Sequence, residues 1–319
     1  MDVQKLVKEE FLSQNLSGRD ANQIILKELS NKLPRFVGGT ADLAPSTKAY
    51  ISDGGDYSYL NRRGKNIHFG VREHSMGAIC NGLYLYLKNP VFCSTFMAFS
   101  NYMLPPIRMS ALMNIPTWFM FSHDSYKVGE DGPTHQSIEQ LGELRLIPNL
   151  NVFRPCDTKE LISCYKLALS TKSPSIFALT KQSLQSQNAN FEDIEKGGYV
   201  LSGEIGEVEI LATGSEVELA MKVKDILESQ DVNVVVCSFP CLNLFDKQSE
   251  KYKRDVLSRG KLLVSLEASN DDVWYKYIGK DGLKISVEAF GKSAKSKDLD
   301  EYLGFNASNI AKIIKKSIK

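Results

Sequence analysis

Short apolar runs alternate with segments of helical periodicity along most of this chain. Between positions 72 and 87 apolar residues recur every three or four positions, which predicts an amphipathic helix that begins near Arg72. Further helices are predicted at 1–34, with a helix start at Ser17, and at 158–169. The strands expected in this part of the chain are 35–41, 66–70, 91–96, 115–121, 151–154 and 175–180.

A change of composition separates this part from the rest of the chain. Residues 183–198 are rich in Gln, Ser, Asn, Asp and Glu and end in Gly197 and Gly198, which is typical of an interdomain linker. The alternation then resumes, with strands expected at 207–212, 232–239, 261–267 and 283–289 and helices at 215–229 and 308–318. The sequence therefore predicts two α/β domains with mostly parallel sheets, spanning 1–186 and 187–319.

Charge and cysteine content narrow the class of protein. The chain has 39 Lys and Arg against 38 Asp and Glu, a balance that predicts no nucleic-acid partner and no membrane partner. It contains no apolar run of membrane-spanning length, and charged residues interrupt its first ten positions, so no signal peptide is predicted. The six cysteines form no Cys-x-x-Cys pair, which favours reduced thiols in a cytoplasmic protein.

Glu73 is the first candidate for chemistry, because it falls in the first turn of the helix that begins near Arg72. An acidic residue there can simply favour the positive end of the helix dipole. It can also be a buried general acid. Burial would raise its pKa and the dipole would lower it, and the sequence leaves that balance open.

Three aromatic residues, Phe96, Phe99 and Tyr102, follow the apolar run at 91–96 at three-residue spacing. This spacing predicts that they share one face of a helix. Such a row is common in an ordinary core, but a flat heteroaromatic ring would need the same row for stacking.

A polar, glycine-containing segment with two histidines follows the apolar run at 115–121. It contains His123-Asp124-Ser125 and then Gly-Glu-Asp-Gly-Pro-Thr-His-Gln at 129–136. These groups are expected at the carboxyl end of a strand, where open α/β sheets bind their ligands. A solvated loop would not need this concentration of histidine and acid.

Taken together, these motifs resemble the C-terminal half of a transketolase. The resemblance rests on Gly-Val-Arg-Glu-His-Ser-Met-Gly at 70–77, Phe-x-x-Phe-x-x-Tyr at 96–102, the two segments at 123–125 and 129–136, and Gly-Gly-Thr-Ala-Asp-Leu-Ala-Pro-Ser at 38–46. It covers essentially the whole chain and is densest from Arg19 to Gln182. It implies a thiamine-diphosphate-binding fold of the pyrimidine type, followed by a transketolase C-terminal domain.

The resemblance also implies a role for individual residues. The implied reaction is the transfer of a two-carbon ketol unit from a ketose phosphate to an aldose phosphate, with thiamine diphosphate as cofactor. In this reaction Glu73 would hold a proton on the aminopyrimidine ring of the cofactor. The implied catalytic residues are Glu73, His123, Asp131 and His135. The implied cofactor-binding residues are Asp42, Glu73, Phe96, Phe99 and Tyr102. The implied substrate-binding residues are Arg19, Ser46, His123, Asp131 and Lys181.

Four positions depart from the family pattern. Lys181 stands where the family usually has Arg, which removes a bidentate phosphate contact. Tyr126-Lys127 replaces the usual Ile-Gly and is expected to narrow the substrate loop. Thr40 replaces a common Ser, which is a mild change.

The chain has no Gly-Asp-Gly metal motif, so no metal ligands are predicted in it. Magnesium or calcium is expected on a separate diphosphate-binding chain, the transketolase N-terminal half. Two origins remain open, a naturally split enzyme or a cut fragment, and the initial Met favours the split gene. A homodimer of this chain, or an α2β2 complex with the missing half, is expected.

Two other functions remain open. One is half of another thiamine-diphosphate enzyme, such as a deoxyxylulose-phosphate synthase or a dehydrogenase β subunit. The other is a non-catalytic, transketolase-like interaction protein that has lost its diphosphate half.

Overall fold

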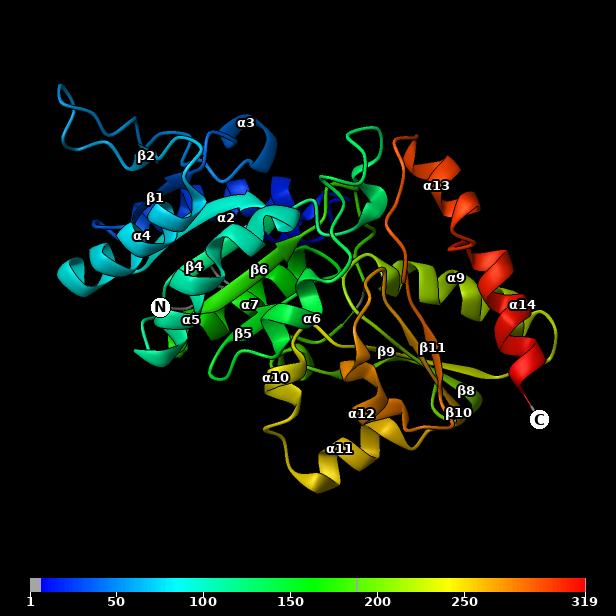
Figure 1. Ribbon diagram of the computed structural model, residues 1–319. Helices are drawn as coiled ribbons and strands as arrows, with labels where there is room; N and C mark the ends of the chain where they lie inside the picture. The colour runs from blue at the N-terminus through cyan, green and yellow to red at the C-terminus, as the bar shows by residue number, and fades with distance from the viewer. Residues whose placement is uncertain (1–6, 188, 319) are drawn as a thin grey trace.

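Two separate β-sheets organise the computed structural model, which describes residues 7–187 and 189–318 (Figure 1). The first sheet has six strands in the order β2-β1-β3-β4-β6-β5, and all its pairings are parallel. Its strands are β1 (Val37–Thr40), β2 (Asn66–His68), β3 (Val91–Phe96), β4 (Trp118–Ser122), β5 (Asn151–Phe153) and β6 (Ser175–Leu179). The carboxyl ends of these strands therefore meet at one edge, where ligands are expected.

The second sheet has five strands in the order β11-β10-β8-β9-β7. They are β7 (Tyr199–Ser202), β8 (Gly206–Ala212), β9 (Val234–Ser238), β10 (Gly260–Leu266) and β11 (Leu283–Ile285). Only β7 is antiparallel to its neighbour, β9, among the described pairings. The prediction of two α/β units with mostly parallel sheets is therefore confirmed.

Helices connect the strands and cover both faces of each sheet (Figure 1). Around the first sheet lie α1 (Glu9–Leu12), α2 (Gly18–Lys32), α3 (Ala44–Thr47), α4 (Glu73–Leu87), η2 (Met97–Met103), α5 (Leu104–Leu112), η3 (Tyr126–Val128), α6 (Gln140–Arg145) and α7 (Thr158–Ser170). The linker and second unit contain α8 (Phe191–Ile194), α9 (Glu216–Glu228), α10 (Leu242–Phe245), α11 (Glu250–Leu257), η4 (Asp272–Trp274), α12 (Tyr275–Ile278), α13 (Ser296–Tyr302) and α14 (Ala307–Ser317).

All the predicted strands are present, and the helix expected near Arg72 begins at Glu73. The helical segment expected at 1–34 consists of two helices, α1 and α2, and its first six residues lie outside the described residues. The helix start predicted at Ser17 is confirmed, because the Ser17 hydroxyl accepts a hydrogen bond from the Asp20 amide and caps α2. The strand predicted at 283–289 ends early, at Ile285. The analysis of the sequence missed β7, an edge strand that is only partly buried.

The sequence of the central strand β4 is apolar without interruption, because both of its faces are covered. Trp118 and Met120 belong to the core on one face, which they share with α2 and α7. Phe119 and Phe121 belong to the core on the other face, together with α4 and α5. A parallel strand that is covered on both sides needs apolar residues at every position, which is what the sequence shows.

The two units share a buried group of charged side chains centred on Arg154, the residue after β5. Its Nε donates to the Asp124 carboxylate at 2.9 Å, and its Nη1 donates to the Thr213 hydroxyl at 2.9 Å and to the Glu216 carboxylate. Asp124 belongs to the first unit, whereas Thr213 and Glu216 belong to the second. Arg154 therefore joins the two units through ion pairs that are shielded from water.

A second arginine repeats this arrangement nearby. Arg145, at the end of α6, forms two 2.8 Å hydrogen bonds with Glu267 and one of 2.7 Å with Asp271. Burial tends to raise the pKa of Glu267, but Arg145 and Arg154 outweigh it and hold that pKa well below its usual range. Glu267 is therefore ionised and binds the second unit to both arginines of the first.

Gly39→Ala tests the packing of the edge strand. A Cβ at position 39 would lie 1.8 Å from the Ile67 carbonyl oxygen, so β1 and β2 would have to separate. We expect a loss of about 1–3 kcal/mol in the free energy of unfolding, as for other overpacked cores. The measurement is the urea midpoint of the purified chain.

Gly82→Ala is the matched control, because a Cβ at this exposed position in α4 would meet no atom within 4 Å. Alanine should raise stability there by about 0.5–1 kcal/mol, since glycine weakens a helix interior. Equal urea midpoints for the two variants would contradict the proposed close approach of β1 and β2.

Candidate active site

Glu73 is the first residue of α4, and its side chain turns inward rather than to solvent. The residue is 9% exposed, and the Thr95 hydroxyl donates to its Oε1 at 3.4 Å. Among the described residues this long contact is the one side-chain hydrogen bond that the carboxylate makes. A buried carboxylate has room for several donors, so Glu73 retains hydrogen-bonding capacity for a bound group.

The three aromatic residues form a continuous row of rings, but not on an α-helix. Phe96 ends β3, whereas Phe99 and Tyr102 lie on the 3₁₀-helix η2. In a 3₁₀-helix, side chains three residues apart align, so the spacing gives ring centroids 5.7 Å and then 6.2 Å apart along the row. Phe96 is buried and Tyr102 is 64% exposed, so the row runs from the core to the surface.

His123 follows β4 and lies against the start of this row. Its ring centroid is 3.9 Å from that of Phe96, and its Nδ1 is 2.8 Å from the Ser122 hydroxyl. Its φ of 63° is in the left-handed region, which non-glycine residues adopt only when their surroundings hold them there.

The imidazole of His123 is neutral. Burial, together with the positive charges of Arg19 and Lys181, lowers its pKa to about 3. At neutral pH the ring can therefore accept one hydrogen bond and donate another, but it carries no charge.

His135 comes from the other end of the same polar loop and reaches the same aromatic row. Its ring centroid is 5.3 Å from Phe99 and 5.9 Å from Phe96. The two predicted histidines therefore lie together although twelve positions separate them in the chain. Asp131 lies in the exposed turn between them.

The predicted phosphate-binding residues lie around the same histidine. Arg19 donates from Nη1 to the Ser46 carbonyl oxygen at 2.7 Å, and its buried Nε has no protein partner. Lys181 donates from Nζ to the Val128 carbonyl oxygen at 3.2 Å. Both cations lower the pKa of His123, so they lie close enough to the imidazole to act on its charge.

Asp42 follows β1 with a φ of 62° and lines a cavity of about 480 Å³, together with Tyr50 and His68. Within the described part of the chain, neither Asp42 nor Asp131 has a side-chain hydrogen bond to another predicted site residue. Direct contacts therefore link several of the other predicted residues to one another, but not these two.

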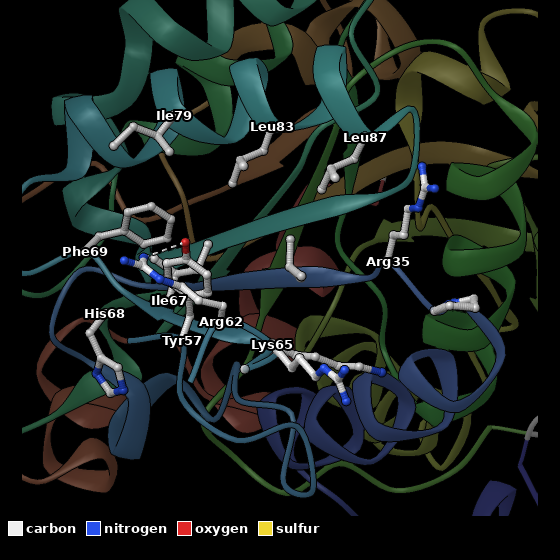
Figure 2. Close-up of a pocket in the computed structure, with 14 residues that line it drawn as sticks. Arg35, Tyr57, Arg62, Lys65, Ile67, His68, Phe69, Ile79, Leu83 and Leu87 are labelled. Atoms are coloured by element: carbon white, nitrogen blue, oxygen red, sulfur yellow. Dashed lines mark hydrogen bonds between the residues drawn. The ribbon is translucent and has the colours of Figure 1, made fainter. Parts of the chain in front are cut away.

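A larger cavity, of about 800 Å³, lies elsewhere, at the outer edge of the first sheet (Figure 2). Ile79, Leu83 and Leu87 from α4 project toward it from one side, and Tyr57, Arg62 and Lys65 lie on the other. It contains none of the predicted site residues.

The expected narrowing of the loop by Tyr126-Lys127 is wrong. The ring of Tyr126 is completely buried and packs with Ile138 and the apolar residues of the second unit, 6.0 Å from the Phe305 centroid. It therefore points away from the site, because the second unit offers an apolar region that the sequence did not reveal.

No group of three or more His, Cys, Asp or Glu residues is placed to bind a metal ion within residues 7–187 and 189–318. In the same ranges no helix is both long enough and apolar enough to span a membrane.

The fold and the site define a pyrimidine-binding α/β domain followed by a second α/β domain. A family profile for the "Transketolase, pyrimidine binding domain" matches residues 14–187, and one for the "Transketolase-like TK C-terminal domain" matches residues 197–306. The chain belongs to the transketolase family, as its motifs predicted. Membership in this family implies dependence on thiamine diphosphate.

Individual relatives agree with this assignment. The transketolase of Aquifex aeolicus (strain VF5) is 42% identical over 320 aligned positions, which cover 98% of this chain and 46% of the relative. The transketolase of Bacillus subtilis (strain 168) is 40% identical over 94% of this chain and 46% of its own length. This chain therefore spans about half the length of these relatives.

Solved transketolase structures are also similar to this chain. The transketolase of Campylobacter jejuni superposes with a TM-score of 0.92 at 40% identity, covering 99% of this chain and 49% of the other. A structure described as "Split gene transketolase, inactive beta4 tetramer" superposes with a TM-score of 0.77 at 22% identity, covering 95% of this chain and 98% of the other. At that identity the second comparison supports the fold alone.

The residues of the site fit the pyrimidine end of such a cofactor. Glu73 keeps unused acceptor capacity beside Thr95, and the aromatic row is open to solvent at Tyr102. A flat ring with a hydrogen-bonding edge matches both features. The sequence analysis missed Thr95, which precedes Phe96 directly, and Arg154, whose only signal was a cation at the end of a strand.

The neutral state of His123 leads to a measurable titration. The chain has only four histidines, so their ring signals in ¹H–¹³C NMR spectra can be assigned individually, with His123→Asn identifying one of them. We expect the His123 signal to stay that of a neutral ring until the pH falls to about 3.

The same shift affects stability, because the unfolded chain binds a proton at this histidine near pH 6.5 and the folded chain does not. The stabilisation is complete above pH 6.5 and is lost as the pH falls from there toward 3. A His123 ring that titrates near pH 6.5 in the folded chain would contradict its burial among cations.

Proposed function

We propose that this chain forms the pyrimidine-binding half of a transketolase active site, which transfers a two-carbon ketol unit from a ketose phosphate to an aldose phosphate. One observation carries this proposal: the buried carboxylate of Glu73 lies beside an aromatic row that leads to two histidines. The family membership and the relatives named transketolase support it. The proposal also includes the division of the chain into two domains, which span residues 1–186 and 187–319.

Glu73 would act on the pyrimidine ring of the cofactor. When bound, thiamine diphosphate supplies an electron sink for cleaving a carbon–carbon bond next to a carbonyl group. A carboxyl group at position 73 would hold a proton at a ring nitrogen, with Thr95 fixing its orientation from the other side. Phe96, Phe99 and Tyr102 would stack on the ring and keep water from the carboxyl group.

The polar loop would handle the sugar. His123 is neutral, so it would orient a hydroxyl group by accepting or donating a hydrogen bond, without a charge of its own. His135 and Asp131 would take part in proton transfers near the reacting carbons. Asp42 would contact another part of the cofactor.

Three residues would bind the phosphate group of the sugar: Arg19, Ser46 and Lys181. The buried Arg19 Nε has no protein partner, so this guanidinium has a donor available for an anion. Lys181 already holds the Val128 carbonyl oxygen and would add a second positive charge. A lysine acts there as a point charge rather than as a bidentate donor.

The diphosphate end of the cofactor would be held by a transketolase N-terminal half, with magnesium or calcium. The chain spans about half of its relatives, which supports a separate or missing partner. We expect this half to be inactive without that partner. Six buried, free cysteines support a reducing, cytoplasmic location.

Glu73→Gln tests the proposed function in the chain assembled with its diphosphate-binding half. The amide keeps the shape of the side chain but cannot supply a proton, so ketol transfer should fall by a factor on the order of 10² or more. The measurement is turnover of a ketose phosphate with an aldose phosphate as acceptor.

Two comparisons complete this test. The wild-type chain without its partner should show no transfer and only weak, calorimetrically measured binding of thiamine diphosphate. Near-normal turnover of Glu73→Gln with the cofactor bound would show that this residue has another role.

Assembly is part of the same proposal. Pro105, Met109, Leu112 and Met113 form an exposed and largely apolar patch at α5, while Pro106 and Ile107, which the sequence suggested for the same surface, are buried. Exposed Tyr86 and Leu85 extend the apolar surface along α4. A surface of this kind on a soluble chain is typical of an interface between proteins.

We therefore expect a homodimer of this chain, which would become an α2β2 complex with the diphosphate-binding half. Sedimentation of the isolated chain should give about twice its mass of 35.7 kDa. Leu112→Asp, at the centre of the exposed patch, should shift it to the monomer, whereas Ile205→Asp, an exposed apolar residue of the second unit, should not. A wild-type monomer at tens of micromolar would refute the homodimer.

A further inference from the structure

The polar loop at 123–136 makes its contacts largely with the second unit, although it belongs to the first. The Tyr126 hydroxyl donates to the Asp300 carboxylate in α13, and the Lys127 ammonium group is 3.1 Å from the same carboxylate. The Tyr126 ring is buried against the second unit's core. One carboxylate of α13 therefore holds two consecutive residues of the loop.

Two residues that follow β6 also hold this part of the loop. Gln182 donates from Nε2 to the Lys127 carbonyl oxygen at 2.6 Å, and Lys181 donates to the Val128 carbonyl oxygen at 3.2 Å. η3 is thus contacted both by Asp300 of the second unit and by Lys181, a proposed phosphate-binding cation.

The end of the loop is bound by the segment that leads into α13. Gln136 donates from Nε2 to the carbonyl oxygens of Gly129 and Lys292, both at 2.9 Å. The Ser293 hydroxyl donates to the Glu130 carbonyl oxygen. A Cβ at Gly291 would lie only 1.8 Å from Gln136 Oε1, so the two segments approach closely.

The start of the loop is fixed by the buried charges described above. Asp124 follows His123 and accepts a hydrogen bond from Arg154, which also binds Glu216 of the second unit. The left-handed φ of His123 is thus maintained next to a fixed carboxylate. The middle and the end of the loop therefore contact the second unit directly, and its start is linked to that unit through Arg154.

We propose that the second unit positions the site histidines, with Asp300 as the positioning residue that holds the loop through Tyr126 and Lys127. The second unit supplies none of the predicted site residues, so its contribution is geometric. The loop has left-handed backbone angles at His123, Gly129 and Gly132 and little regular structure, so its order depends on such contacts. This inference rests on the proposed function only in treating the loop as part of the site.

Asp300 is the contact that can be removed without destroying the fold. Its side chain is 24% exposed, so water can replace it. Arg154, in contrast, is completely buried, and its loss would leave several carboxylates without a counter-charge. Variants of Asp300 therefore separate positioning from folding.

The experiment compares Asp300→Ala with Asp300→Asn and with Glu301→Ala, a control that removes an exposed carboxylate from the next position of α13. Hydrogen–deuterium exchange of the full chain is measured by mass spectrometry. Peptides within 123–136 should exchange about tenfold faster in Asp300→Ala, as expected for a lost charge-assisted hydrogen bond. Peptides of β8 report whether the core of the second unit remains folded.

Asp300→Asn should restore most of the protection, because its amide oxygen can still accept from Tyr126. Glu301→Ala should match the wild type. As a second readout, the His123 ring in Asp300→Ala should titrate at a higher pH than in the wild type, since a loosened loop exposes the imidazole to water. A structural role elsewhere in α13 would not move this titration.

Unchanged exchange at 123–136 together with an unchanged His123 titration in Asp300→Ala would overturn the inference. Neither readout needs turnover. Failure of the proposed function would be visible instead as full activity of Glu73→Gln, whatever the loop does. The two ideas can therefore fail separately.

Discussion

The buried ion pairs of Arg154 are the constraint on which the rest of the molecule depends. A guanidinium without water must be surrounded by acceptors, and here these acceptors come from both units: Asp124 from the first, Thr213 and Glu216 from the second. The second unit even makes room for the side chain, since a Cβ at Gly214 would lie 2.9 Å from Arg154 Cγ. The two sheets are therefore held in one relative position.

These ion pairs also affect the candidate site, because Asp124, which binds Arg154, directly follows His123 in the chain. Asp124 is fixed by Arg154, and His123 precedes it in a backbone conformation that is unfavourable for an L-residue. Burial of the imidazole against Phe96 and near two cations then keeps it uncharged. The electrostatic character of the site is thus a consequence of packing between units as much as of the residues themselves.

The candidate site keeps binding capacity that the described residues do not use. Glu73 is buried but keeps free acceptor capacity, Arg19 has a buried donor without a protein partner, and the aromatic row ends in an exposed Tyr102. These groups can therefore contact a bound molecule. Their common location at the carboxyl ends of parallel strands is the position that open α/β sheets reserve for ligands.

The sequence by itself determined the alternation of strands and helices, the start of α4, and the motifs that carry the family resemblance, because these depend on local periodicity and residue type. Only the tertiary structure decided where side chains distant in sequence meet. It packs the Tyr126 ring against the second unit and places Arg154 between carboxylates from both units. Burial and contacts between elements set these outcomes, and neither has a local signature in the chain.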